Sequence, residues 1–116
     1  MTSTGFGWIK YEGKIYQHDI MITVSGQVVP RNETELRRKY GTAHAIDPDE
    51  IKFLLKEQPE VIVVGTGQEG MAKLTNEAKN VIMQSSVRVI EGPIPAACKK
   101  FDELKGKKAA LFHVTC

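Results

Sequence analysis

The sequence predicts a three-layer α/β fold in which helices flank a central five-stranded mixed sheet. Three observations support this prediction. The 116 residues are the length of one domain, so residues 1–116 are expected to fold as a single unit. Alternating apolar and polar residues near the start of the chain indicate a β-hairpin. From residue 47 onward, helix-like and strand-like segments alternate, which is typical of helices packed around a largely parallel sheet. The expected sheet therefore joins an N-terminal hairpin to a β-α-β-α-β unit.

The hairpin is predicted near residues 6–11 and 15–24, within the segment FGWIKYEGKIYQHDIMITVSG. Its apolar residues recur with the period of two that marks a strand covered on one face. Glu12 and Gly13 supply the turn between the two strands. The hairpin is expected to form the first two strands of the central sheet.

Residues 27–46 form the least regular part of the sequence. Pro30 ends the extended structure, Asn32 caps a short helical turn, and Gly41 stops that turn. Connecting segments carry functional residues more often than cores do. This segment is therefore a candidate source of binding groups.

Three helices and three strands are predicted after this irregular segment. Asp47 at the N-cap and Pro48 at the first helical position open the first helix. Thr75 caps the second helix, and Gly106 is expected to end the third. The strands are a β-branched run and two further apolar segments, at residues 61–64, 87–92 and 108–116.

Composition and charge narrow the class of protein. Net charge is only +2, so the concentrated basic face of a nucleic-acid-binding protein is not expected. The first residues lack the apolar segment of a secretory signal, and no apolar run is long enough to span a bilayer. The two cysteines, Cys98 and Cys116, are expected to be free thiols in a cytoplasmic protein.

Gly65, Gly67 and Gly70 follow the apolar run 61–64 with the spacing G-x-G-x-x-G. A strand before this motif, and Glu91 in the position of a ribose-binding acid, are features of a dinucleotide fingerprint. The predicted helix, however, starts at Thr75 or later, too far from the glycines to direct its dipole at a phosphate. A structural turn and a site for another small anion are both alternatives to nucleotide binding, and Gly70 is interpreted as loop slack.

The sequence gives little indication of a metal site or of a nucleophilic cysteine. His113 and Cys116 lie three residues apart, and on a regular strand such residues point to opposite faces. Neither a metal site nor a cofactor is therefore predicted. Cys98 lies near the start of the third helix beside its apolar face, so a buried thiol is expected rather than a reactive one.

Five stretches of the sequence together resemble a known family: GTAH (41–44), PEVIVVGTG (59–67), SSVRVIE (85–91), AACKKFDEL (96–104) and LFHVTC (111–116). The chain is similar to a widespread small α/β family of largely unassigned function in archaea and bacteria. Its eukaryotic relatives include an adipogenesis-associated protein and a mitochondrial complex I assembly factor. The resemblance implies a mixed five-stranded sheet with the last strand inside it, antiparallel to its neighbours. It implies no catalytic mechanism, and it implies roles exerted through other proteins.

Two hypotheses for the function follow. The first is a non-enzymatic protein-interaction or assembly module, with protein partners and a homodimer among its expected properties. The second is a small anionic-ligand binder, or an unrecognised enzyme, with its site at the carboxyl ends of the parallel strands. In that site Gly65, Thr66 and Gly67 would line the turn, and His44 and Arg31 would supply polar contacts.

Overall fold

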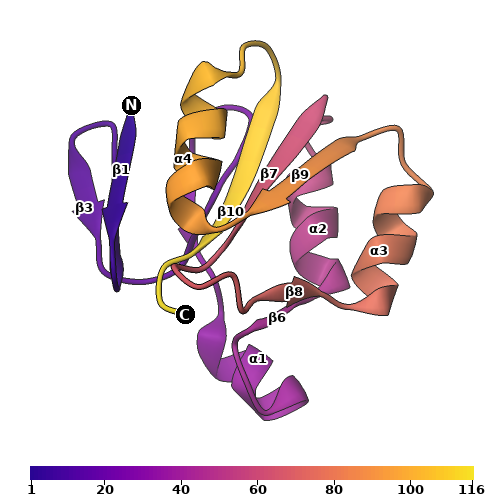
Figure 1. The fold of residues 1–116 in the computed structure, drawn as a ribbon. Helices are drawn as coiled ribbons and strands as arrows, with labels where there is room; N and C mark the ends of the chain where they lie inside the picture. Colours follow the sequence, from indigo (N-terminus) through magenta and orange to yellow (C-terminus); the bar gives the residue numbers. More distant parts are fainter.

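The computed structural model describes residues 1–116 and contains a five-stranded mixed sheet at its centre (Figure 1). The strand order is β5-β4-β10-β7-β9. This arrangement confirms the predicted fold class. The bounds of these strands are Ile20–Ile22 for β4, Val28–Pro30 for β5, Val61–Thr66 for β7, Arg88–Gly92 for β9 and Lys108–His113 for β10.

The predicted hairpin forms, but it lies in a second sheet. β1 (Thr2–Gly5), β2 (Trp8–Tyr11) and β3 (Lys14–Tyr16) make a separate three-stranded antiparallel sheet. The single strand expected over residues 15–24 is therefore wrong, because the chain leaves the small sheet after β3 and enters the central sheet at β4. The break falls beside Asp19, whose carboxylate turns inward to buried partners. β5, which the sequence did not indicate, replaces the hairpin's first strand in the central sheet.

β10 is the middle strand of the central sheet and has neighbours of both directions. It runs antiparallel to β4, with Ala110 opposite Ile22, and parallel to β7, with Ala110 opposite Val63. The expectation that β10 is antiparallel to both neighbours is thus correct for β4 and wrong for β7. The physical reason is that β7, β9 and β10 are linked through helices, and such crossovers return the chain in a parallel direction.

The chain forms four helices: α1 (Glu33–Tyr40), α2 (Pro48–Leu55), α3 (Asn76–Met83) and α4 (Ile94–Glu103). The last three flank the sheet, and α1 lies beyond its end (Figure 1). Asp47 caps α2 in a capping box with Glu50, and Thr75 caps α3, as predicted. α4 ends before the predicted glycine stop, because Leu104 already has an extended backbone and packs against the core. Two short strands, β6 (Ala45–Ile46) and β8 (Lys73–Leu74), pair in parallel beside the helices.

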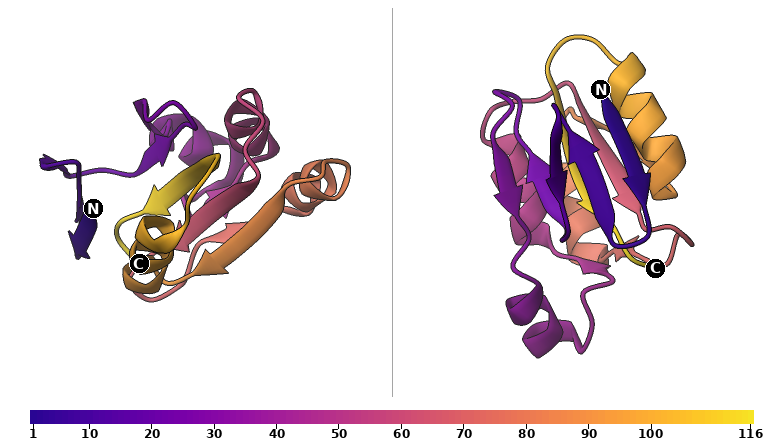
Figure 2. Two further views of the ribbon diagram at one scale, coloured as in Figure 1. Left: turned by 90° about the horizontal axis from the view of Figure 1, so that it is seen from above. Right: turned by 90° about the vertical axis from the view of Figure 1, so that its left-hand side faces the viewer.

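The two faces of the central sheet carry separate hydrophobic cores. Residues alternate between faces along β10, so Ala110 and Phe112 join one core while Ala109 and Leu111 join the other. The first core lies under α4 and the small N-terminal sheet, and the second lies under α2 and α3. Figure 2 shows the small sheet standing out at the side of the molecule. The three layers expected from the sequence are therefore present, with the small sheet added to the α4 layer.

Candidate functional site

Gly65 and Gly67 each occupy a position where no larger residue fits. A Cβ atom at Gly65 would lie 2.7 Å from Cδ1 of Phe112. A Cβ atom at Gly67 would lie 2.2 Å from the main-chain carbon of Cys116, and the φ angle of Gly67 is +102°. The prediction of a tight turn is thus confirmed for Gly67, whereas Gly65 lies within β7 and is needed for its close approach to Phe112.

The backbone amides of this turn are already hydrogen-bonded within the protein. Main-chain oxygens of the segment after β10 accept from them at 2.7 to 3.2 Å: the oxygen of Thr115 accepts from Gln68, and that of Cys116 from Glu69 and Met71. The amide of Gly70 donates to the oxygen of Gly67, and Gly70 has φ +72°. Gly70 is therefore a required left-handed position, not loop slack. A phosphate could use these amides only by displacing the segment after β10.

Arg31, expected to contact a ligand, is a buried ion with every donor in use. Its Nε and one Nη bind both carboxylate oxygens of Glu50, at 2.6 and 2.9 Å. The other three N–H groups donate to the Asp19 carboxylate at 2.8 Å and to the main-chain oxygens of Ala43 and Ala45. Burial lowers the pKa of Arg31, but the hydrogen bonds and charges of Glu50 and Asp19 outweigh it and leave the pKa above its ordinary value. A guanidinium has five N–H donors, so Arg31 has none left for a ligand.

Asp19 joins Arg31 to His113 deep in the protein. One carboxylate oxygen of Asp19 lies 2.7 Å from Nδ1 of His113, and the other accepts the Val114 amide at 2.8 Å. Because a carboxylate only accepts, Nδ1 of His113 carries the proton in this bond. Burial raises the pKa of Asp19, but the hydrogen bond from His113, the Val114 amide and the charge of Arg31 outweigh it, so this pKa lies below its ordinary value.

His113 continues this chain of hydrogen bonds to a hydroxyl group. Its Nε2 lies 3.2 Å from Oγ1 of Thr115. Acid, imidazole and hydroxyl thus follow one another as in the triads of hydrolases. His113 is only 2% exposed, and neither it nor Thr115 lines the pockets described below. We therefore interpret the arrangement as a structural tie between β4 and β10.

His44 lies against the same histidine. Its ring centroid is 5.1 Å from that of His113, edge to face, and its main-chain oxygen accepts the Lys73 amide at 2.8 Å. Thr66 is the register partner of His113 in the parallel β7–β10 pair. A Cβ at Gly67 would lie 2.8 Å from the His113 ring. The residues predicted as a site therefore do gather in one region, at the carboxyl ends of the parallel strands.

Three groups that hold this region together were not predicted from the sequence: Asp19, Glu50 and His113. The sequence does contain a signal for two of these residues, because Asp19 and His113 lie within or directly beside apolar strand residues. A buried ionisable group needs a partner of opposite charge or a hydrogen bond, so each predicts a companion elsewhere in the chain. The sequence does not indicate which companion, because 94 positions separate the two.

An open pocket of about 320 Å³ lies at the ends of β7 and β9, where the sequence placed the site. Its polar lining consists of the Thr66 hydroxyl, the Lys73 and Lys79 ammonium groups and the Glu91 carboxylate. None of these four side chains forms an ion pair or a hydrogen bond within the protein. Of the residues predicted from sequence, Thr66 is the one that reaches a pocket.

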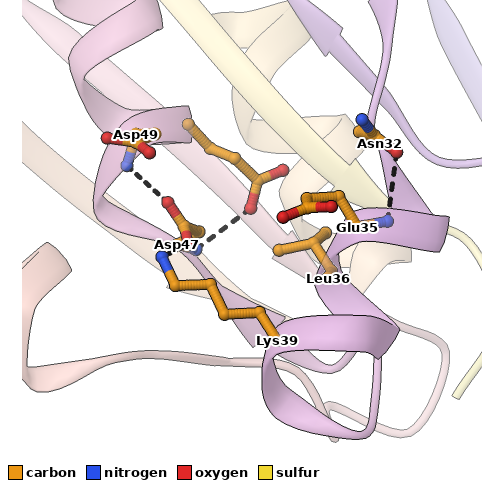
Figure 3. A pocket seen from close by; sticks show the side chains of 7 residues that line it. Asn32, Glu35, Leu36, Lys39, Asp47 and Asp49 are labelled. Atoms are coloured by element: carbon orange, nitrogen blue, oxygen red, sulfur yellow. Dashed lines mark hydrogen bonds and ion pairs between the residues drawn. The ribbon is translucent and has the colours of Figure 1, made fainter.

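A smaller pocket of about 150 Å³ lies between α1 and the start of α2 (Figure 3). Figure 3 shows its polar walls bonded to the backbone: Asn32 caps α1 through the Glu35 amide, and Asp47 caps α2 through the Asp49 amide. Lys39 also pairs with Asp47 at 3.0 Å. Because helix capping and this ion pair occupy the polar groups, we interpret this pocket as a structural feature.

Comparisons with known proteins identify the family. The family model described as "Protein of unknown function (DUF498/DUF598)" matches residues 1–113. The chain belongs to this family. No curated protein matches it.

Solved structures of similar proteins share the fold of this DUF498/DUF598 member. A conserved hypothetical protein from Pyrococcus horikoshii is 39% identical, with TM-score 0.89, covering 98% of this chain and 97% of the other. A protein named MT938 is 36% identical, with TM-score 0.82, covering 100% and 98%. A Mth938-like domain from Bordetella pertussis, 19% identical with TM-score 0.60, covers 97% and 83% and shows the fold alone.

β9 forms one open edge of the central sheet in this DUF498/DUF598 chain. It pairs with β7 only. The Arg88 amide donates to the Glu60 oxygen at 3.1 Å, so the alternation of a parallel ladder turns the main-chain groups of Val89 and Glu91 away from β7. A pocket of about 220 Å³ lies between this edge and α4. The edge and the pocket together form what we call the β9 groove, lined by Ile90, Glu91, Gly92, Ala96, Ala97 and Lys100.

Two further properties of the structure concern metal ions and membranes. No three His, Cys, Asp or Glu side chains are placed to hold a metal ion. No helix combines the length and the hydropathy needed to cross a membrane.

Proposed function

We propose that this chain is a protein-interaction module that takes up an extended segment of a partner protein along the β9 groove. The observation that carries the proposal is the open edge of β9. A strand edge with free N–H and C=O groups is a template for an added strand, and β-strand addition is a recurring mode of peptide recognition. The main-chain groups of Val89 and Glu91 would pair with the incoming segment.

The pocket beside β9 supports this proposal because it offers a place for a partner side chain. Ile90 and Gly92 lie on the α4 face of the sheet, in register with Val63 and Gly65. A Cβ atom at Gly92 would have no atom within 4 Å, so the groove is open where the strand ends. Alternate side chains of an added strand point to the same face. One of them would enter the apolar wall formed by Ile90, Ala96 and Ala97.

The charges along the groove indicate the chemistry of the partner. Arg88 and Glu91 lie at opposite ends of the edge, and Lys100 lies on the rim. A partner segment with a small apolar residue at its centre and opposite charges toward its ends would match them. A second copy of this chain is an alternative partner, since two β9 strands paired antiparallel could set Val89 of each opposite Glu91 of the other, the two residues whose main-chain groups point outward.

The resemblance to eukaryotic assembly proteins, drawn from the sequence, supports the same proposal. We propose further that the protein works in the cytoplasm, as its free thiols suggest. A homodimer through β9 is the second form that the interaction could take.

Peptide selection tests the proposal. Random decapeptides displayed on phage are selected for binding to the immobilised chain. The site where the selected peptides bind is then mapped by the amide chemical shifts of the chain. We expect shifts at Val89–Gly92 and along α4. Replacing Glu91 by Pro removes an outward amide without touching the ladder, and Ala96→Trp fills the pocket. Each should weaken selected peptides about tenfold or more, a loss of about 1.4 kcal/mol.

Matched controls keep this test sharp. Glu91→Ala keeps the amide, and Lys99→Trp adds the same ring at an exposed α4 position outside the pocket. Lys99→Trp should bind the selected peptides as the unchanged chain does, and Glu91→Ala, which loses the carboxylate but keeps the amide, should lose less affinity than Glu91→Pro. Sedimentation of the chain without peptide distinguishes the two kinds of partner. If the chain is a dimer that Glu91→Pro dissociates, the partner at β9 is a second copy of the chain and not a peptide segment. Peptides that bind all four variants equally would contradict the β9 proposal.

A further inference from the structure

We propose that the pocket at the carboxyl ends of β7 and β9 binds a small organic oxyanion that also carries a hydroxyl group. The pocket lies on the α3 face of the sheet, opposite the β9 groove, because Thr66 and Glu91 alternate with the residues that face α4. Figure 1 shows β8 and the start of α3 beside this end of the sheet. Its volume of about 320 Å³ is that of a site for a small metabolite.

Thr66 provides the first argument. It is 6% exposed, yet no group of the protein hydrogen-bonds its hydroxyl. No buried side-chain nitrogen or oxygen in the protein lacks a partner, so this hydroxyl reaches solvent, and Thr66 lines the pocket. Threonine is frequent in strands, but the hydroxyl of a buried threonine usually has a hydrogen-bond partner within the protein. A hydroxyl held by the fold and directed into a cavity is instead suited to a ligand.

The two lysines provide the second argument. Lys73 extends from β8 and Lys79 from the first half of α3, and both line the pocket. Neither forms one of the ion pairs of the protein. A lysine near the positive end of a helix is electrostatically unfavourable, whereas an anion there is favoured. An oxyanion between the two ammonium groups would relieve both effects.

Glu91 narrows the class of ligand. It is the one acidic residue of the pocket lining, and it leaves a net charge of about +1 there when the two lysines are counted. A carboxylate repels a bare polyanion and accepts a hydrogen bond from a donor. The ligand should therefore present a hydroxyl to Glu91 and Thr66 and its anionic group to the lysines. Phosphate esters and hydroxycarboxylates share this chemistry.

Amide chemical-shift titration of the unchanged chain tests this inference. Glycerol 3-phosphate and glycerate share a three-carbon hydroxylated skeleton, so they separate the two sources of the oxyanion. Inorganic phosphate and glycerol present the anion and the hydroxyl alone. We expect one of the two organic anions to bind, with shifts at Thr66, Lys73, Lys79 and Glu91, about tenfold more tightly than phosphate. Whichever of the two binds identifies the source and supports the inference.

Four variants test the roles of the Thr66 hydroxyl and of the lysine pair. Thr66→Val keeps the shape of the side chain but removes the hydroxyl, so it should weaken binding about tenfold. Thr66→Ser keeps the hydroxyl and should bind as the unchanged chain does. Replacing both Lys73 and Lys79 by Met should abolish binding. The matched control replaces Lys10 and Lys105, exposed lysines outside the pocket, and should leave binding unchanged.

Three results would overturn the inference: no shift with either organic anion, unaltered binding by Thr66→Val, or equal loss in the control pair. Ala96→Trp fills only the β9 groove on the other face of the sheet. It should leave oxyanion binding unchanged, so a failure of the peptide proposal is distinguishable from a failure of this one.

Discussion

The buried ion network around Asp19 can be tested by Asp19→Asn. This substitution keeps the size of the side chain and removes its charge. The carboxylate of Asp19 accepts three hydrogen bonds, from Arg31, His113 and the Val114 amide. An asparagine offers one oxygen and an NH₂ group. If the oxygen keeps the Val114 amide, the NH₂ group faces the Arg31 guanidinium, and two donors then oppose each other.

The expected loss of stability follows from the burial of the network. The side chains of Asp19 and Arg31 are 1% and 0% exposed, and removing one partner of a buried ion pair costs about 3 to 5 kcal/mol. Arg31 keeps its two bonds to Glu50, which places the expected loss toward the lower figure. For a domain of this length, a loss of about 3 kcal/mol corresponds to a drop of roughly 10 to 15 °C in Tm. The fold should survive, since such domains have a stability of about 5 to 15 kcal/mol.

Urea unfolding followed by circular dichroism measures this loss. Asp49→Asn is the control, because Asp49 is exposed and should change the free energy of unfolding by about 0.5 kcal/mol or less. A double-mutant cycle with Arg31→Met should show that the second substitution costs much less once Asp19 is neutral. A loss below about 1 kcal/mol for Asp19→Asn, or full additivity in the cycle, would refute the reasoning.

Three further predictions concern other parts of the molecule. Gly67→Ala should lower the free energy of unfolding by about 1 to 3 kcal/mol, because Gly67 has a φ of +102° and an added Cβ would collide with Cys116. Gly92→Ala is the control, since a Cβ there would have no atom within 4 Å. Equal losses of stability for the two variants in urea titrations would contradict this prediction. The pKa values of Asp19 and Asp47 lie below the ordinary 3.8 in the folded protein. Their contribution to stability is therefore complete above the unfolded pKa and is lost as pH falls below about 4. In an acid titration, the free energy of unfolding of Asp19→Asn should fall less steeply than that of the unchanged chain. Burial raises the pKa of the Cys98 thiol to about 11, so iodoacetamide at pH 8 should label Cys116 first, and equal rates by mass spectrometry would be inconsistent with a buried Cys98.

Local signals made most of the helices and central strands predictable. Asp47, Thr75 and Asn32 cap the helices that the sequence assigned to them, because a cap depends on residues within one turn. The β-branched run that starts at Val61 is buried along its whole length, as a strand covered on both faces should be.

Sheet membership was not predictable from such local signals. The period-two pattern of residues 15–24 continues through the bend at Asp19, so it does not reveal that β3 and β4 belong to different sheets. The direction of β10 relative to β7 depends on which strands the helices connect, and periodicity does not report this.

The candidate site was located more accurately than its chemistry. The rule that ligands bind at the carboxyl ends of parallel strands predicted a site beside Thr66, and the structure has a pocket there. The roles of Arg31 and of the glycine-turn amides depended on partners far away in sequence, Asp19 and the segment after β10. The sequence contains those residues but does not indicate that they meet.

The central position of β10 has a consequence for how the protein is made. β4 and β5 form one half of the sheet, β7 and β9 form the other, and β10 alone bridges them. Both hydrophobic cores also include β10 residues. Lys108–His113 leaves the ribosome after every other strand, so β4 and β7 lack their shared neighbour β10 until then. The nascent chain should therefore expose two unfinished sheet edges until β10 emerges, and this domain should gain protease resistance in a single step at that point.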